Sequence, residues 1–243
     1  MDNSWCITLG NKRILVDPWL EGEEVDFFPW FNTQWHGTPP IAYNKIPDYD
    51  IVLITQKYPD HFHIQTLLKL QPKLLIVPSS IQKRTKALLP DAKVFSLNKE
   101  NRIYKDGDLT IQWFSTSRKI DPIYDAVVLS DAKEAVFIAP HGYHFKSKPD
   151  IDVPVKVLIS TLNHFKLPFF LGGTVAPGIE GLKHLNINLS PEYIIATHDE
   201  DKLAKGLVMR VAKVVRVGKQ ELLDFPELYQ KCFEINDYNP VSL

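Results

Sequence analysis

Acidic and imidazole side chains follow three apolar runs of the sequence, each time just after the run ends. The runs and their polar turns are Ile51 to Thr55 before Asp60, His61 and His63, Ala135 to Ile138 before His141, and Tyr193 to Thr197 before His198. One carboxylate with several imidazoles is a ligand set that suits zinc, iron or manganese. A metal held in this way lowers the pKa of a bound water to near 7, which is the chemistry of metal-assisted hydrolysis.

The elements that must position these side chains follow from the same runs. Each run has the length and composition of a buried β-strand, and Ile64, Leu67 and Leu68 then recur at the spacing of one helix face. Because the carboxyl ends of parallel strands lie at one edge of a sheet, where α/β folds bind ligands, we expect the three turns to converge. A single histidine in such a turn is more often structural, so the prediction depends on this convergence. The histidines without such a context, expected to be structural, are His36, His144, His164 and His184.

The rest of the chain predicts further strands, hairpins and a helix. Trp5 to Leu9 and Arg13 to Asp17 are joined by Gly10-Asn11, a pair typical of a two-residue hairpin. The other expected elements are strands at Leu74 to Val77, Lys93 to Leu97 and Val155 to Ser160, a helix from about Ser79 to Leu89, and antiparallel hairpins between Arg102 and Val136.

Three more segments are assigned from local composition. Glu21 to Pro47 is rich in aromatic residues and prolines, which predicts a loop that acts as a lid or packs as an Ω-loop. Pro177 suits the first position of a helix that contains the apolar stripe from Ile179 to Leu189. The residues from Lys202 onward are expected to be helical.

Composition limits the classes of protein and partner. The 243 residues are 44% hydrophobic and carry a formal net charge of −1 from 28 basic and 29 acidic side chains. We expect one compact domain over residues 1–243 that acts on a small molecule and contacts neither nucleic acid nor a membrane. Cys6 and Cys232 suit a reduced protein, in the cytoplasm or in an organelle lumen after removal of a transit peptide. The oligomeric state is left open.

The order of these elements resembles that of the metallo-β-lactamase fold superfamily. Ile14 to Asp17, followed by Pro18, is similar to that family's early strand and its aspartate. Ile51 to Thr55 with Asp60-His61 is similar to the family motif Thr-His-x-His-x-Asp-His, and His198 lies where the family carries its last histidine. The resemblance runs from about Ser4 to Leu207. It implies an α/β fold, a four-layer αββα sandwich with two mixed sheets packed face to face and helices outside.

The chain departs from the family motif at several ligand positions. Gln56 and Tyr58 stand where the first two histidines are expected, and Pro140 and His141 replace a glycine and the bridging aspartate. Ser115 to Asp121 has no histidine where the third ligand of the first metal should fall. The resemblance therefore implies a lost first metal site and a second site of Asp60, His61 and His198, with His141 in place of the bridging carboxylate. This degenerate motif is similar to a divergent, phosphosugar-lactonase-like branch found in cyanobacteria and plants.

Several functions remain open from the sequence. One is a hydrolase with a single divalent transition metal, zinc before iron or manganese, acting on a small phosphorylated or lactone-like substrate. Gln56 and Tyr58 would then face the substrate, with Tyr58 as an oxyanion or proton donor or as a packed aromatic ring. The alternative is a binding module without metal or catalysis that kept the fold. A weaker third hypothesis is a redox or oxygen-handling metal site.

Overall fold

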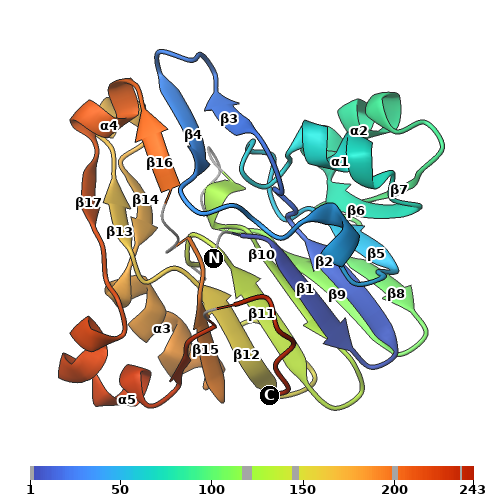
Figure 1. Ribbon diagram of the computed structural model, residues 1–243. Helices are drawn as coiled ribbons and strands as arrows, with labels where there is room; N and C mark the ends of the chain where they lie inside the picture. Colours follow the sequence, from blue (N-terminus) through green and yellow to red (C-terminus); the bar gives the residue numbers. More distant parts are fainter. Residues whose placement is uncertain (1–2, 117–121, 144–147, 199–201, 236) are drawn as a thin grey trace. The chain divides into compact units, whose positions relative to one another are not determined.

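The computed structural model describes residues 3–116, 122–143, 148–198, 202–235 and 237–243. It has a mixed α/β fold with several sheets and few, short helices, so the predicted α/β class is confirmed (Figure 1). The chain divides into two compact units. We call Asp2–Trp113 with Asp201–Arg210 the N-terminal unit, and Phe114–Glu200 with Val211–Leu243 the C-terminal unit.

The N-terminal unit contains a five-stranded sheet in the order β1-β2-β5-β6-β7. Its strands are β1 (Trp5–Leu9), β2 (Lys12–Val16), β5 (Ile51–Leu53), β6 (Leu74–Pro78) and β7 (Lys93–Leu97). β1 and β2 form the predicted hairpin, whereas β2, β5, β6 and β7 run parallel. Parallel strands are usually buried on both faces, and the three residues of β5 are fully buried. The turns after β2 and β5 therefore open at the same edge of this sheet.

Two helices cover one face of that sheet. They are α1 (Ile64–Leu70) and α2 (Gln82–Leu88), the latter preceded by the 3-10 turn η2 (Ser79–Ile81). Leu67, Ile81 and Leu89 pack with Val52 and Leu75 in one hydrophobic cluster. The predicted strand, polar turn and helix around His61 is confirmed, because β5 is followed by the turn and then by α1.

A second, three-stranded sheet of the N-terminal unit occupies segments for which the sequence predicted no strands. It pairs β3 (Glu23–Asp26), β4 (Asn32–His36) and β16 (Lys202–Lys205) in the order β16-β4-β3. The predicted loop over Glu21 to Pro47 is therefore wrong in part, as is the helix predicted from Lys202. These strands are polar, and their pairing joins residues far apart in sequence, so no local apolar pattern marks them. The remaining elements are η1 (Tyr43–Lys45), the hairpin β8 (Ile103–Asp106) and β9 (Leu109–Phe114), and α4 (Leu207–Val211).

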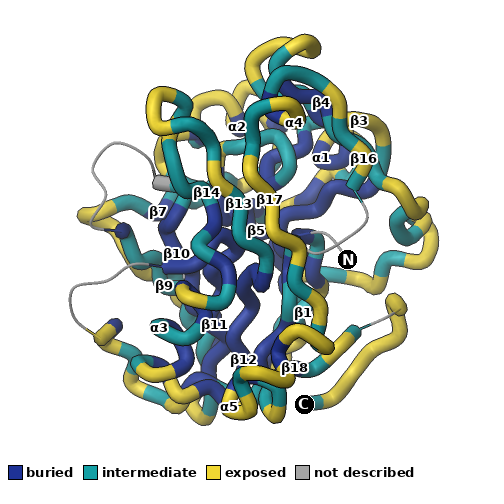
Figure 2. Tube along the Cα trace, turned by 90° about the vertical axis from the view of Figure 1, so that its left-hand side faces the viewer, coloured by how far each residue is buried: buried dark blue, intermediate teal, exposed yellow. Residues whose placement is uncertain are grey.

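The C-terminal unit is built on strands that run in the order β18-β15-β12-β11-β10. They are β10 (Ala126–Ser130), β11 (Ala135–Ala139), β12 (Val155–Ser160), β15 (Tyr193–Ala196) and β18 (Cys232–Phe233). β10 is antiparallel to β11, whereas β11, β12, β15 and β18 run parallel. β10, β11 and β12 are buried along most of their length (Figure 2). The turns after β11 and β15 consequently lie at one edge, separated by β12.

Helix α3 (Ile179–Leu189) covers a face of these strands. Its Leu182, Leu185 and Leu189 pack with Phe137 and Leu158 in a hydrophobic cluster. A small sheet in the order β14-β13-β17 and several short helical turns complete the unit. They are β13 (His164–Lys166), β14 (Thr174–Pro177), β17 (Lys213–Val215), η3 (Pro122–Tyr124), η4 (Phe169–Leu171), η5 (Gln220–Asp224) and α5 (Pro226–Tyr229).

The start of α3 differs from the sequence prediction by two residues. Pro177 ends β14 instead of opening the helix, and Gly178 is the N-cap, with φ +64°. A Cβ at position 178 would lie only 2.9 Å from the Leu162 carbonyl oxygen. The close approach and the left-handed backbone both require glycine here, which moves the helix start past the proline.

Across the described residues, no helix is long and apolar enough to cross a lipid bilayer. Both cysteines, Cys6 and Cys232, are free thiols.

Candidate functional site

His61 is fixed by a buried carboxylate from the neighbouring strand. Asp17 directly follows β2, and its Oδ2 lies 2.7 Å from His61 Nδ1. Asp17 also accepts hydrogen bonds from the Thr55 backbone N–H, at 2.7 Å, and from the Thr55 hydroxyl. Asp17 and His61 are both fully buried. The carboxylate thus holds Nδ1 and sets the direction in which Nε2 of the ring points.

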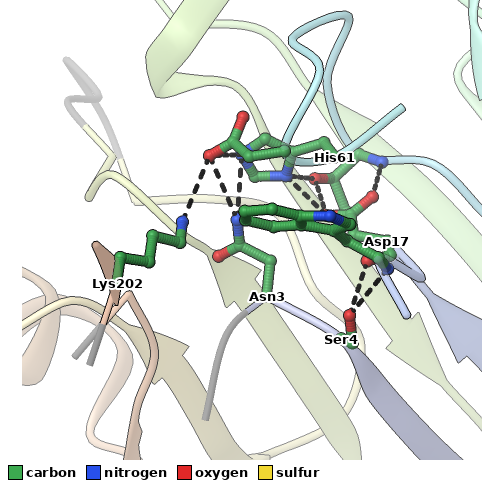
Figure 3. Close-up of polar contacts among 8 residues, drawn as sticks. Asn3, Ser4, Asp17, His61 and Lys202 are labelled. Atoms are coloured by element: carbon green, nitrogen blue, oxygen red, sulfur yellow. Dashed lines mark hydrogen bonds and ion pairs between the residues drawn. The ribbon is translucent and has the colours of Figure 1, made fainter. Parts of the chain in front are cut away.

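The other nitrogen of His61 faces a small polar group (Figure 3). His61 Nε2 lies 3.8 Å from Asp60 Oδ2, and Asn3 Nδ2 lies 3.4 Å from both atoms. The ammonium of Lys202 lies 3.8 Å from the same Asp60 oxygen. We refer to Asn3, Asp17, Asp60, His61 and Lys202 as the Asp60 group; all five belong to the N-terminal unit.

The Asp60 group alters the proton affinities of its own members and of a neighbour. Burial alone lowers the pKa of His61, but the carboxylates of Asp60 and Asp17 raise it by more, so it lies above its ordinary value. Burial raises the pKa of Asp17, against the opposing effect of the His61 ring. Burial and then repulsion from Asp60 raise the pKa of Asp26 to about 6. Carboxylates next to an imidazole increase its basicity, which strengthens it as a metal ligand.

The other two predicted ligands lie together in the C-terminal unit. His141 follows β11 and His198 follows β15, and their ring centroids are 4.5 Å apart. The backbone of His198 has φ +58°, a left-handed conformation that is uncommon outside glycine. The side-chain amide of Asn163 donates to the His198 carbonyl oxygen at 3.0 Å. We call these two residues the His141–His198 pair.

A tight turn also places His141. The Gly142 N–H donates to the Ala139 carbonyl oxygen at 2.9 Å, and Gly142 has φ +81°. A Cβ on Gly142 would lie 3.2 Å from the Pro177 side chain, so the turn has little room for another residue. The tight turn therefore changes the direction of the chain directly after β11 and places His141 at the carboxyl end of that strand.

Gln56 and Tyr58 lie in the turn between β5 and α1. Gln56 is 3% exposed and Tyr58 is half-buried. The Tyr58 carbonyl oxygen accepts hydrogen bonds from the backbone N–H groups of His61, at 3.0 Å, and Phe62, at 2.7 Å. The backbone of Tyr58 therefore shapes the turn that places His61, independently of any role of the phenol.

The remaining histidines differ in their contacts. His63 is the N-cap of α1, where its Nδ1 accepts from the Thr66 N–H at 3.3 Å and bonds the Thr66 hydroxyl at 2.8 Å. The His36 ring packs on Trp19 with centroids 4.0 Å apart. His164 Nδ1 lies 3.4 Å from the Pro177 carbonyl oxygen. His144 lies outside the described residues, as do residues 117–121 of the segment searched for a third ligand.

Sequence reasoning missed two members of the Asp60 group. Asn3 precedes the first strand in a segment without any motif. Lys202 was assigned to a helix, although the alternation of Lys202, Leu203, Ala204 and Lys205 between half-buried and exposed positions fits the strand that the structure shows. For Asp17 the sequence offers only the family resemblance, which assigns it no role.

Comparisons with known proteins bear on the fold. A family model described as a beta-lactamase superfamily domain matches residues 1–198. The structure is similar to isothiocyanate hydrolase from Delia radicum gut bacteria, with a TM-score of 0.67, 16% identity and coverage of 100% of this chain and 97% of that chain. It is also similar to a possible metal-dependent hydrolase from Veillonella parvula DSM 2008, with a TM-score of 0.70, 14% identity and the same two coverages, 100% and 97%.

A third similar structure is the CmlA beta-hydroxylase, with a TM-score of 0.60, 11% identity and coverage of 89% of this chain and 52% of that chain. A search among curated protein sequences finds no match. At these identities the similarity concerns the fold alone, because one fold supports several reactions.

Proposed function

This chain belongs to the metallo-β-lactamase superfamily, and from that premise we propose that it is a metal-dependent hydrolase. Proteins of this fold typically depend on metal ions. In the proposal, Asp60, His61, His141 and His198 hold one divalent ion, for which they offer one carboxylate and three imidazoles. The two units then work as a single domain over residues 1–243, with the Asp60 group and the His141–His198 pair supplying two ligands each.

The observation that carries this proposal is the pairing of His61 with Asp17. A metal-binding imidazole usually gives its other nitrogen to a carboxylate or carbonyl, which fixes the tautomer and orients the ring. The 2.7 Å contact from His61 Nδ1 to Asp17 supplies that carboxylate, while Nε2 lies beside the Asp60 carboxylate. The donor set also fits zinc, iron or manganese, and we propose zinc first.

The chemistry divides between the ion and the protein. A divalent ion held by these ligands supplies Lewis acidity and makes water a stronger acid near neutral pH. Asp17 keeps the proton of His61 on Nδ1, and Asn3 donates to the Asp60 carboxylate and limits its rotation. The amide of Gln56 and the phenol of Tyr58 replace two ligands of the family motif, and we assign them to substrate binding as hydrogen-bond donors.

The substrate class is the finer part of the proposal. We propose a small phosphorylated or lactone-like substrate; the phosphosugar-lactonase-like branch that the degenerate motif resembles brings no known substrate of its own. The balanced charge of the chain supports action on small molecules in preference to nucleic acid. The two free cysteines support a reducing compartment, and we propose the cytoplasm. Both structural neighbours described as hydrolases are consistent with bond cleavage by water, although their identities to this chain are low.

Metal analysis of protein purified without chelators or a histidine tag tests the proposal. We expect about one equivalent of a transition metal per chain, and its loss in His198→Ala, because one of the few ligands is removed. The matched control is His184→Ala, which removes a histidine from helix α3 and should leave the metal in place. The proposal fails if purified protein carries no transition metal and binds none on titration with zinc.

A binding module without catalysis is the second candidate. Gln56 favours it, because an amide is a poor zinc ligand at a position where the motif has a histidine. Turnover of a panel of phosphodiesters and lactones separates the two candidates. Hydrolysis that disappears in His198→Ala excludes the binding module, whereas metal-loaded protein that hydrolyses nothing in the panel supports it.

A further inference from the structure

The side chain of Asn3 lies against both proposed metal ligands of the N-terminal unit. Its Nδ2 lies 3.4 Å from Asp60 Oδ2 and 3.4 Å from His61 Nε2, and those two atoms are 3.8 Å apart (Figure 3). Asn3 is only 2% exposed, so its amide is held close to these atoms inside the unit. Asn3 has other interactions as well, and only these two contacts carry the inference.

The separations among these three atoms are close to those within a metal coordination shell. Nitrogen and oxygen ligands of zinc lie about 2.0–2.2 Å from the ion, so two such ligands in a tetrahedral arrangement are about 3.4 Å apart. The observed separations of 3.4, 3.4 and 3.8 Å are similar to this value. An ion that binds Asp60 and His61 can therefore also reach the end of the Asn3 amide.

The end of the amide that faces the two ligands must change when an ion binds. In the metal-free protein both neighbours are acceptors, because Asp17 holds the proton of His61 on Nδ1 and leaves a lone pair on Nε2. The NH2 group of the amide suits two acceptors. A bound ion uses both lone pairs, repels the NH2 group and attracts the amide oxygen. A half-turn about the Cβ–Cγ bond exchanges the two ends, and this torsion is broad and roughly two-fold in asparagine.

We propose that Asn3 is a further metal ligand, which presents Oδ1 to the ion bound by Asp60 and His61. The inference rests on the proposed function, because it takes those two residues as ligands. A carbonyl oxygen suits manganese, whereas zinc is usually bound by imidazole, thiolate and carboxylate groups. Asn3 should therefore raise the affinity of the site for manganese more than its affinity for zinc.

A positioning role for Asn3 makes different predictions. In that role the NH2 group continues to donate to Asp60 while the ion is bound, and it supports the binding of both metals to the same extent. Aspartate at position 3 separates the two roles, because an ionised carboxylate offers an oxygen at either end and cannot donate.

Metal titrations of variants without added N-terminal residues test the assignment. Metal-free wild type, Asn3→Leu and Asn3→Asp are titrated with zinc and, separately, with manganese against a competing indicator. Leucine keeps the approximate size of the side chain and removes both ends of the amide. The matched controls are Asn44→Leu and Asn44→Asp, because Asn44 is exposed and lies in the same unit. Urea unfolding monitors the fold, and the visible absorption of the cobalt(II)-loaded proteins reports changes in the ligand set.

We expect Asn3→Leu to lose at least about tenfold in manganese affinity and less than about threefold in zinc affinity. Asn3→Asp should bind manganese at least as tightly as the wild type, because a carboxylate oxygen takes the place of the amide oxygen. The cobalt(II) absorption should change in Asn3→Leu. Both Asn44 variants should match the wild type in every measurement.

Four outcomes overturn the assignment in folded protein that binds zinc. They are no manganese binding by the wild type, an equal change or no change in the two affinities of Asn3→Leu, weaker manganese binding by Asn3→Asp, and an unchanged cobalt(II) absorption in Asn3→Leu. Failure of the wild type to bind any of the metals contradicts the proposed function itself, so the two failures are distinguishable. If Asn3→Leu does not fold, Asn3→Ala replaces it in the same titrations.

Discussion

The buried carboxylate of Asp17 contacts the ring of His61, whereas Asn163 contacts the backbone of His198. The Asp60 group depends on a chain of hydrogen bonds from Thr55 to Asp17 and on to His61. His198 instead follows its strand in a left-handed conformation, and Asn163 holds its carbonyl oxygen. Both ligand groups come from turns at the carboxyl ends of parallel strands, but the Asp17 carboxylate holds the ring of His61, whereas the positive φ and the Asn163 contact concern the backbone of His198.

This difference predicts which substitutions will lower the stability of the fold and which will weaken metal binding. A buried hydrogen-bonded network is destabilised when one member is removed, because its partners lose compensation for burial. A residue with a Cβ in a left-handed backbone conformation costs folding free energy, and the conformation persists where the surrounding structure over-determines it. The Asp60 group should therefore support both the fold and the metal, whereas His198, with its left-handed backbone, should support the metal at the expense of the fold.

Breaking the Asp60 group should have the largest effect. In Asp17→Asn a neutral amide replaces the carboxylate that pairs with the His61 ring. The substitution itself is compatible with the backbone, because asparagine tolerates the positive φ of 43° at this position. We expect the free energy of unfolding of the metal-free protein to fall by about 1–3 kcal/mol. Zinc affinity should fall by about tenfold to a hundredfold, since the partner that orients a ligand is lost.

Urea unfolding in chelator and competition titration with a zinc indicator measure these two quantities. The exposed Asp91→Asn is the control, which should match the wild type in both. An Asp17→Asn protein with wild-type stability and zinc affinity would show that Asp17 does not support His61.

The pH dependence of stability tests how burial and the neighbouring Asp60 carboxylate act on Asp26. The pKa of Asp26 is raised to about 6, first by burial and then by repulsion from Asp60. An unfolded aspartate titrates near 3.9, so between these two values the folded protein holds a proton that the unfolded chain has released. The stability that Asp26 contributes is therefore present below about pH 4 and is lost as the pH rises through about 6.

Replacing Asp26 with asparagine should remove this loss. Between pH 4.5 and pH 7, we expect metal-free Asp26→Asn to gain on the order of 1–2 kcal/mol relative to the wild type, after allowance for solvent screening. Urea unfolding at both pH values measures the gain, and the exposed Asp108→Asn should follow the wild type. Parallel pH profiles for Asp26→Asn and the wild type would contradict the raised pKa of Asp26.

The contrast between buried parallel strands and polar strands explains how much of the fold the sequence predicts. The sequence predicts β12 with its observed bounds, Val155–Ser160, because a parallel strand buried on both faces is a largely apolar run between turns, interrupted here only by Lys156. β4 and β16 were missed because their residues are largely polar and their strand conformation comes from pairing between residues 32–36 and 202–205. A local window contains no information on such a partner.

The candidate site follows the same division. The positions of Asp60, His61, His141 and His198 could be predicted because strand ends are visible in the sequence, and the structure brings Asp60 to His61 and His141 to His198. Asn3 could not be predicted, because nothing in its neighbourhood marks a contact with residues nearly sixty positions away. Lys202 could not be assigned to the group before β16 was known to be a strand, since the face of its side chain depends on that conformation.

The backbone strain at His198 can be tested by the sign of a small stability difference between glycine and alanine variants. At position 198, where φ is +58°, His198→Gly should be more stable than His198→Ala by about 1 kcal/mol, because a Cβ is disfavoured in the left-handed region. His141 is not among the described residues with a positive φ, so there His141→Gly should be less stable than His141→Ala by about 0.5–1 kcal/mol. All four variants lose one imidazole, and we expect each to bind zinc more weakly than the wild type.

Urea midpoints of the four metal-free proteins measure the two differences. The same sign at both positions would mean that the backbone of His198 is not strained.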